Sequence, residues 1–127
     1  MLTKSSKGLC VVFVVSTLGR SGPTRQLLNL VRHLCALSVT VHIVTLSPEP
    51  NESLIDVFRS SKLTLHSLGL TRLQSILYGI TKLKNLITEL DPDIIHSQGL
   101  RSDALCAYLK HPVKITTQRN NPSSDYP

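Results

Sequence analysis

The feature that most constrains the fold is the alternation of two sequence textures along the chain. Short apolar runs rich in β-branched residues, such as Leu9–Ser16, alternate with longer segments whose apolar residues recur at helical spacing. A strand that is apolar on both faces is typical of a parallel sheet, because helices must then cover both faces. The sequence therefore predicts an α/β fold built from β-α-β crossovers.

Five strands are predicted, at Leu9–Ser16, Val39–Leu46, Leu63–Leu68, Ile94–Ser97 and Val113–Thr117. Helices are predicted between them, over Thr24–Leu37, Glu52–Ser60, Thr71–Leu90 and Ser102–Lys110. With right-handed crossovers, these elements give a Rossmann-like doubly wound parallel sheet of order 3-2-1-4-5 with helices on both faces. A chain of 127 residues suits one domain, so residues 1–127 are predicted to form a single one.

Local patterns predict how the helices begin, end and face the sheet. In the first helix the apolar spacing predicts a buried face, which consists of Leu27, Leu30, Val31 and Leu34. The Asp91-Pro92 step is predicted to stop the third helix, because proline disfavours helical geometry in the residue before it. Ser102 is predicted to cap the helix that it opens.

Charge and cysteine content narrow the function classes. The 14 Lys and Arg exceed the 8 Asp and Glu, giving a formal charge of +6, which favours anionic partners. The three cysteines are widely spaced without a C-x-x-C pair, which argues against a disulfide framework or a zinc knuckle and fits a cytoplasmic location. The apolar run Leu9–Val15 is too short to cross a membrane and lacks a signal-peptide cleavage site.

The predicted topology also predicts where a ligand binds. In doubly wound sheets, ligands bind beyond the carboxyl ends of the strands at the switch point, here between the first and fourth strands. This places the site at Thr17–Arg25, Ser97–Arg101 and Gln118–Asn121.

The loop that enters the first helix is the leading candidate for phosphate contact. It contains Gly19, Arg20, Ser21 and Gly22, and glycines next to a helix N-terminus let backbone N–H groups approach an anion. The alternative interpretation is a turn that requires flexible residues. Neither G-x-G-x-x-G nor a Walker sequence is present, and Ser47 stands where a ribose-binding acid would follow the second strand, which disfavours a nicotinamide-dependent oxidoreductase.

Two further side chains have both a functional and a structural interpretation. Arg25, in the first helical turn, either contacts a phosphate or is simply solvated. His96, near the end of the fourth strand, either binds a hydroxyl or shuttles a proton in the cleft, or packs at the strand end. His33, His42 and His66 are interpreted as structural, and no metal cluster is predicted.

Three segments resemble the N-terminal domain of family 4 glycosyltransferases with the GT-B fold. Arg25–Leu34, after its glycine-containing turn, is similar to the family's G-G-x-E-R turn and following helix. Pro92–Gly99 resembles P-D-I-I-H-x-H, and Thr117–Asn120 resembles T-x-H-N. The three matches occur in the family's order across nearly the whole chain.

The chain departs from the family pattern at four positions. Ser21 replaces the first glycine, Thr24 the glutamate, and Gln98 the second histidine. Arg119 replaces the histidine of T-x-H-N, which helps sugar transfer in some members, so no catalytic residue is assigned.

The resemblance implies a hexosyltransferase that moves a sugar from a nucleotide-sugar donor to a glycan or lipid-linked acceptor, as in cell-envelope polysaccharide synthesis. It implies that this chain is the acceptor-side half and that the C-terminal donor-binding domain is absent from it, so the chain alone is expected to be inactive. The implied substrate-binding residues are Gly19, Ser21, Gly22, Arg25, His96, Gly99, Arg101, Arg119 and Asn120. The donor is a co-substrate, and the resemblance implies no cofactor or metal.

Partners and location follow from the same resemblance. Its members often lie on the inner face of the membrane, and the basic N-terminal third of this chain suits peripheral docking there. Only the net charge favours nucleic acid, which is not an expected partner. The alternative function is a stand-alone module that binds a nucleotide or phosphate ligand without catalysis.

Overall fold

The computed structural model describes most of the chain, namely residues 8–71, 74, 78–99, 102, 105–107, 109 and 114–117. Its elements in chain order are β1 (Cys10–Val15), α2 (Gly22–Ala36), β2 (Thr40–Thr45), α3 (Ile55–Arg59), β3 (Thr64–Ser67), α5 (Ile80–Leu90), β4 (Ile94–Gln98) and β5 (Lys114–Thr117). The strands lie in the order β3-β2-β1-β4-β5, and every neighbouring pair is parallel. The predicted Rossmann-like α/β class is confirmed.

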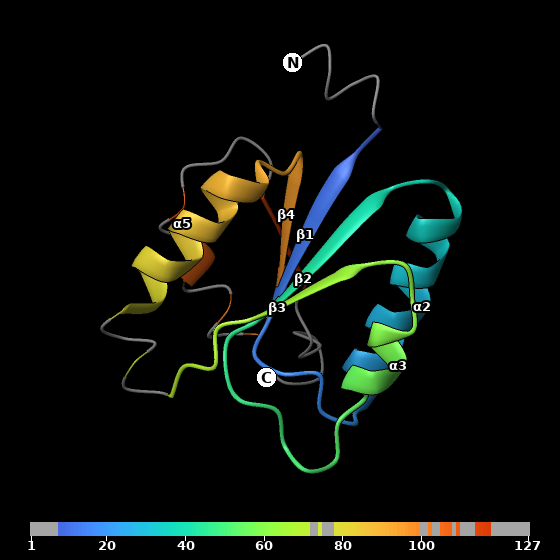
Figure 1. The fold of residues 1–127 in the computed structure, drawn as a ribbon, viewed down its shortest axis with the longest axis horizontal. Coiled ribbons are helices and arrows are strands. Elements are labelled where there is room, and N and C mark those ends of the chain that lie inside the picture. The colour runs from blue at the N-terminus through green and yellow to red at the C-terminus, as the bar shows by residue number, and fades with distance from the viewer. Residues whose placement is uncertain are drawn as a thin grey trace, which may run out of the picture.

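The central position of β1 in the sheet explains why its residues are apolar on both faces. It lies at the centre of the sheet, where Val11 pairs with Val41 of β2 on one side and with Ile94 of β4 on the other. Its odd-numbered residues, such as Phe13, pack in the core under α2 and α3, and its even-numbered residues, such as Val12, pack in the second core beneath α5. Figure 1 shows α2 and α3 on one face of the sheet and α5 on the other.

Helix α2 begins close to the predicted position, but the prediction that Leu30 is buried is wrong. The Ser21 hydroxyl accepts a hydrogen bond from the Thr24 N–H, and a proline stands in the first turn, as expected at a helix start. Leu27 and Val31 are buried as predicted, whereas Leu30 is 39% exposed. Leu28 is buried instead, because the face toward the sheet also includes Thr24 and its centre is rotated away from Leu30.

Helix α5 ends where the sequence predicts. Asp91 adopts a left-handed conformation with φ of 47° and donates its N–H to the Ile87 carbonyl at 2.8 Å. The helical spacing of its apolar residues predicts a buried stripe, which consists of Leu73, Ile76, Leu77, Ile80, Leu83, Ile87 and Leu90. Leu83 and Ile87 are buried against the sheet, as this spacing predicts. The predicted buried residues Leu73, Ile76 and Leu77 lie outside the described residues.

Two further observations concern the remaining helical segments. Ser102 is fully buried, and within the described part of the chain its hydroxyl has no hydrogen-bond partner, so the predicted cap is not seen. No helix in the part of the chain that the structure describes is long and apolar enough to cross a membrane.

Candidate functional site

The candidate site lies at the carboxyl ends of β1 and β4, where the topology predicts it. The register pairs Val14 with Ser97, so the loop after β1 and the end of β4 reach the same edge of the sheet. Figure 1 shows that the β1–α2 loop, residues 16–21, and the β2–α3 loop, residues 46–54, extend from the same end of the sheet. The site is therefore formed by loops that are distant in sequence.

A carboxylate from the β2–α3 loop binds the β1–α2 loop. The N–H of Leu18 donates to both oxygens of Glu49, at 3.0 Å to Oε1 and 3.1 Å to Oε2. The hydroxyl of Ser53 lies 2.6 Å from Glu49 Oε1 and 3.2 Å from the Leu18 carbonyl. Glu49 and Ser53 thus join two loops at the predicted site.

Backbone hydrogen bonds complete the connection between these loops. The Leu54 N–H donates to the Leu18 carbonyl at 2.8 Å, and the Arg20 N–H donates to the Glu52 carbonyl at 3.3 Å. Gly19 and Ser53 form an isolated antiparallel bridge. The sequence analysis missed this arrangement, although Glu49, the first acidic residue of the chain, stands in the loop that follows a predicted strand and was a usable signal.

Gly19 of the β1–α2 loop and Gly22, the first residue of α2, have different surroundings. A Cβ on Gly19 would lie 3.3 Å from Cγ of Pro50 and 3.4 Å from Oγ1 of Thr17, so close packing explains the glycine there. A Cβ on Gly22 would meet nothing within 4 Å. Among the described residues, the hydrogen bonds leave the Gly22 N–H without a partner. The space beside Gly22 can therefore admit an anion at the start of α2.

The polar side chains around Gly22 differ in their freedom. The Ser21 hydroxyl lies 3.0 Å from Oγ1 of the buried Thr24, so Ser21 holds the helix start. Arg25 is exposed in the first turn, and its N–H donates to the Ser21 carbonyl at 3.1 Å. Because the Arg25 side chain is exposed, its guanidinium is free of core packing and is accessible to a ligand at the start of α2.

His96 lies within β4 and packs against the aromatic ring of β1. It pairs in register with Phe13, and the two ring centroids are 5.0 Å apart with the planes tilted by 36°. The imidazole therefore packs at the strand, as the structural interpretation expects. It is only half-buried, so part of the ring is still accessible to solvent. Gly99 follows β4 with φ of +95°, and a Cβ on it would meet nothing within 4 Å. The predicted Arg101, Arg119 and Asn120 lie outside the described residues.

A pair of histidines lies on the α5 face of the sheet, away from this loop cluster. Nδ1 of His42 is 3.1 Å from Nε2 of His66. Burial lowers the pKa of both imidazoles; the neighbouring His66 lowers the pKa of His42 further, whereas Glu89 partly opposes the shift of His66. Within the described residues, no group of three or more His, Cys, Asp or Glu side chains is placed to hold a metal ion.

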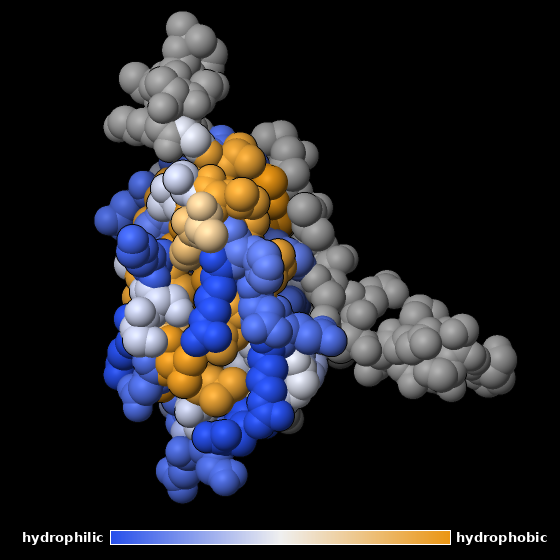
Figure 2. All heavy atoms as spheres, turned by 90° about the vertical axis from the view of Figure 1, so that its right-hand side faces the viewer, coloured by the Kyte–Doolittle hydropathy of each residue, from blue (hydrophilic) through white to orange (hydrophobic). Residues whose placement is uncertain are grey.

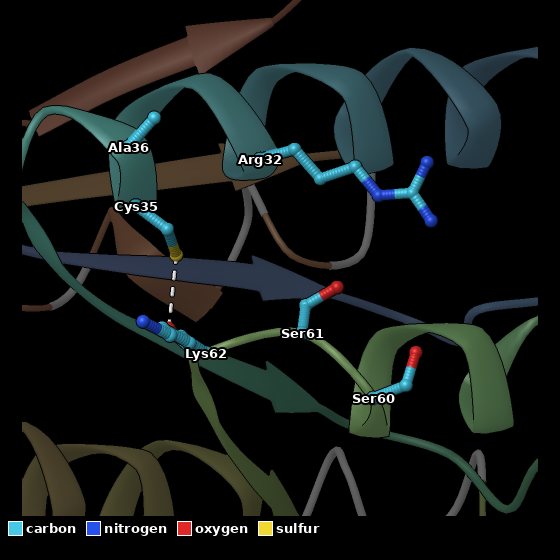
Figure 3. A pocket seen from close by; sticks show the side chains of 6 residues that line it. All are labelled: Arg32, Cys35, Ala36, Ser60, Ser61 and Lys62. Atoms are coloured by element: carbon cyan, nitrogen blue, oxygen red, sulfur yellow. Dashed lines mark hydrogen bonds between the residues drawn. The ribbon is translucent and has the colours of Figure 1, made fainter.

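A shallow groove of about 410 Å³ lies beside the C-terminal half of α2. Figure 3 shows Arg32 and Cys35 on the helix facing the turn that holds Ser61 and Lys62. The Cys35 thiol donates to the Lys62 carbonyl at 2.9 Å, and burial raises its pKa, which the Lys62 charge partly offsets. Because α2 starts at the carboxyl edge and runs away from it, the groove is separate from the candidate site.

The sheet order and the loops at its switch point define a Rossmann-like α/β domain. The sequence model of Glycosyltransferase Family 4 matches residues 20–124, which include α2, β4 and all three segments on which the resemblance was based. The chain belongs to glycosyltransferase family 4. This family acts on sugars, so the chain is a glycosyltransferase domain. A comparison with curated proteins found no match.

Proposed function

We propose that this chain is the acceptor-side domain of a glycosyltransferase that moves a sugar from a nucleotide-sugar donor to a glycan or lipid-linked acceptor. Cell-envelope polysaccharide synthesis is the reaction class that fits such an acceptor. The observation that carries the proposal is the family match over residues 20–124, on a Rossmann-like fold in which the start of α2 and the end of β4 lie at one edge of the sheet. The open backbone at Gly22 supports a phosphate-bearing donor there.

Each site residue has a defined task in this proposal. Gly22 and the N-terminus of α2 approach the donor diphosphate, and the Arg25 guanidinium neutralises its charge. Gly19 and Ser21 fix the loop that presents them. His96 and Gly99 line the acceptor side together with Arg101, Arg119 and Asn120. The leaving diphosphate is then stabilised by fixed N–H groups and guanidinium charge, an electrostatic form of catalysis.

Sugar transfer in this proposal requires a donor-binding domain in addition to residues 1–127. The nucleotide sugar lies between the two domains, and the present chain supplies the acceptor side and part of the diphosphate contacts. No resident cofactor is part of the proposal, since the donor is consumed as a substrate. The domain acts in the cytoplasm, on the inner face of the membrane.

Site-resolved binding tests this proposal directly. The ¹⁵N-labelled chain is titrated with UDP, GDP and the corresponding glucose and mannose nucleotides, and amide shifts are followed by NMR. We expect shifts at residues 19–25 and at Gly99, with Arg25→Ala weakening them and Arg32→Ala, on the same helix, leaving them intact. Shifts confined to the groove at Arg32 and Lys62, or no shifts at all, would contradict the proposed donor contacts.

Transfer of a labelled sugar forms the second part of the test. The chain is incubated with labelled nucleotide sugars and a lipid extract as acceptor, alone and with a family donor-binding domain supplied separately. We expect no product from the chain alone. Product from the chain alone would disprove the requirement for a second domain, whereas nucleotide binding without transfer in either case would favour a binding module.

A further inference from the structure

Glu49 lies at the centre of the connection between the two loops of the candidate site. Its carboxylate is half-buried and accepts hydrogen bonds from the Leu18 N–H and the Ser53 hydroxyl. The Ser53 oxygen in turn accepts from the Ile55 N–H at 3.1 Å, at the start of α3. One side chain thus links the segment after β1 to the beginning of α3.

The chemistry of these contacts makes the carboxylate more than a filler of space. Hydrogen bonds to an ionised acceptor are stronger than those between neutral groups, and the short Ser53 contact is of this kind. The Leu18 N–H lies in a buried residue, so its donor needs a partner within the protein. Removing the carboxylate would leave that N–H unpaired, which favours a different conformation of the loop.

The position of Leu18 connects Glu49 to the start of α2. Leu18 is followed directly by Gly19, whose space is limited by Pro50 of the same β2–α3 loop, and three residues later by the Ser21 cap. The β2–α3 loop therefore fixes both the beginning and the middle of the segment that leads to Gly22. Glu49 does not bind the Gly22 N–H, so that donor stays available for a ligand.

We propose that Glu49 is the positioning residue of the site: it fixes the β1–α2 loop so that Gly22 and the N-terminus of α2 can accept the diphosphate of a nucleotide donor. This role rests on the proposed function for its ligand, but the control of the loop by Glu49 stands on the contacts alone. Glu49 itself touches no substrate. Its carboxylate accepts hydrogen bonds from Leu18 and Ser53, and not from Gly22, where the diphosphate is proposed to bind.

Three variants distinguish this role from a general effect of charge or stability. Glu49→Ala removes both hydrogen-bond acceptors, whereas Glu49→Gln keeps a carbonyl acceptor for Leu18 and removes the charge. Glu52→Ala is the matched control, because Glu52 is an exposed acid of the same loop and contributes its backbone carbonyl to Arg20. Amide hydrogen exchange of residues 18–22 reports the loop, and NMR titration with UDP or GDP reports affinity. Urea unfolding reports global stability.

We expect Glu49→Ala to speed exchange at the Leu18 amide and to weaken nucleotide binding roughly tenfold, the size expected for losing a hydrogen bond to a charged group. Glu49→Gln should restore both properties to within about threefold, which a role through charge alone would not allow. Glu52→Ala should change neither. A purely structural role would alter unfolding by urea but leave the affinity of the folded protein unchanged.

The two proposals fail in different ways. If Glu49→Ala leaves exchange at residues 18–20 as in the parent chain, the positioning role is wrong, whatever the nucleotide does. If exchange rises but the affinity is unchanged, the loop does not set donor binding and the inference is also wrong. If the parent chain binds no nucleoside diphosphate, the proposed donor site is wrong and the ligand half of this inference falls with it.

Discussion

Asp93 belongs to the P-D-I-I-H segment that resembles the family, and its carboxylate stabilises the sheet by a hydrogen bond to the first residue of β1. Oδ2 of Asp93 accepts a hydrogen bond from the Cys10 N–H at 2.8 Å, and the Asp93 N–H donates to the Cys10 carbonyl at the same distance. These bonds join the first residue of β1 to the residue before β4. His96 of the same segment packs its ring against Phe13. A segment that resembles a functional motif therefore also contains residues with structural roles.

Two glycines at the site predict opposite responses to substitution. Gly99→Ala should lower the free energy of unfolding by about 1–2 kcal/mol, because φ of +95° is unfavourable for a residue with a Cβ. Gly22→Ala should leave the free energy of unfolding unchanged or slightly higher, because its Cβ meets nothing and alanine favours helices. Urea unfolding measures both. Equal losses for the two variants would contradict this account of the backbone.

The histidine pair predicts a dependence of stability on pH. Burial lowers the pKa of His42 and His66 in the folded state, and for His42 the neighbouring His66 adds to this effect. The unfolded chain therefore binds more protons below about pH 6.5, so stability is full above that pH and falls as the solution becomes more acidic. Urea unfolding at about pH 5 and pH 8 measures the loss.

The control for this prediction is His33, which is exposed on α2. His42→Gln should reduce the loss of stability at low pH, because the unfolded state then has one fewer imidazole to protonate. His33→Gln should leave the loss as it is in the parent chain. The same acid sensitivity in the His42 variant as in the parent would show that the pair does not cause it.

At the scale of elements, the periodicity of the sequence predicted the five strands and the helices α2, α3 and α5, although α5 begins at Ile80 and the sequence predicts a helix from Thr71. Most of the helix predicted over Ser102–Lys110 lies outside the described residues. The ends of β1, β2 and β3 differ from the predicted ends by one residue each, since local composition marks them. The prediction of which face of α2 is buried was less accurate. The apolar spacing shows that one face is buried, but the packing of the helix on the sheet decides how that face is rotated. Leu28 and Thr24 are buried and Leu30 is exposed, a result that depends on how α2 sits on β1 and β2.

Helix α2 offers a matched pair of leucines to test this orientation. Leu27→Ala should lower the free energy of unfolding by about 2–5 kcal/mol, because it leaves a cavity in the core under the helix. Leu30→Ala should change it by less than about 1 kcal/mol, because that side chain already contacts solvent. Chemical unfolding at neutral pH compares them. A larger loss for Leu30→Ala would mean that the helix is rotated differently.

At the scale of the whole molecule, the surface shows where basic residues gather. Figure 2 views the α2–α3 face, where hydrophilic side chains alternate with hydrophobic atoms at the upper end and again in the lower half. Arg25, Arg32 and Lys62 are exposed on this face, and Leu37 is 73% exposed at the end of α2. Arg59, also exposed there, forms an ion pair with Asp56 at 3.3 Å. Basic side chains with a neighbouring exposed leucine fit the proposed docking to an anionic membrane surface.

Vesicle binding tests this docking. We expect the chain to bind vesicles of phosphatidylglycerol but not of phosphatidylcholine, and to dissociate in about 1 M salt, where the screening length is about 3 Å. Replacing Arg32 and Lys62 with glutamate should abolish sedimentation with the vesicles. Replacing Lys82 and Lys84, on exposed positions of α5, makes the same charge change on the other face and should have a smaller effect. Equal loss from both pairs would indicate binding by net charge alone.

The candidate site was only partly predictable. The topology rule placed it at the loops after β1 and β4, and Gly22 and Arg25 lie there with the freedom that ligand contact requires. Close packing against Pro50 explains why residue 19 is a glycine, and the sequence analysis did not identify Glu49 at all. Both depend on a loop that starts about thirty residues later in the chain, beyond the reach of a local pattern.

The sequence by itself determined the class of fold, the order of its elements and the edge of the sheet where the candidate site lies. Apolar periodicity is a local property, and the rules for crossover handedness then leave few topologies. Only the tertiary structure decided which face of α2 is buried, that Phe13 packs against His96, and that Glu49 holds Leu18. These contacts join residues far apart in the chain, so they exist only once the sheet has brought its loops to one edge.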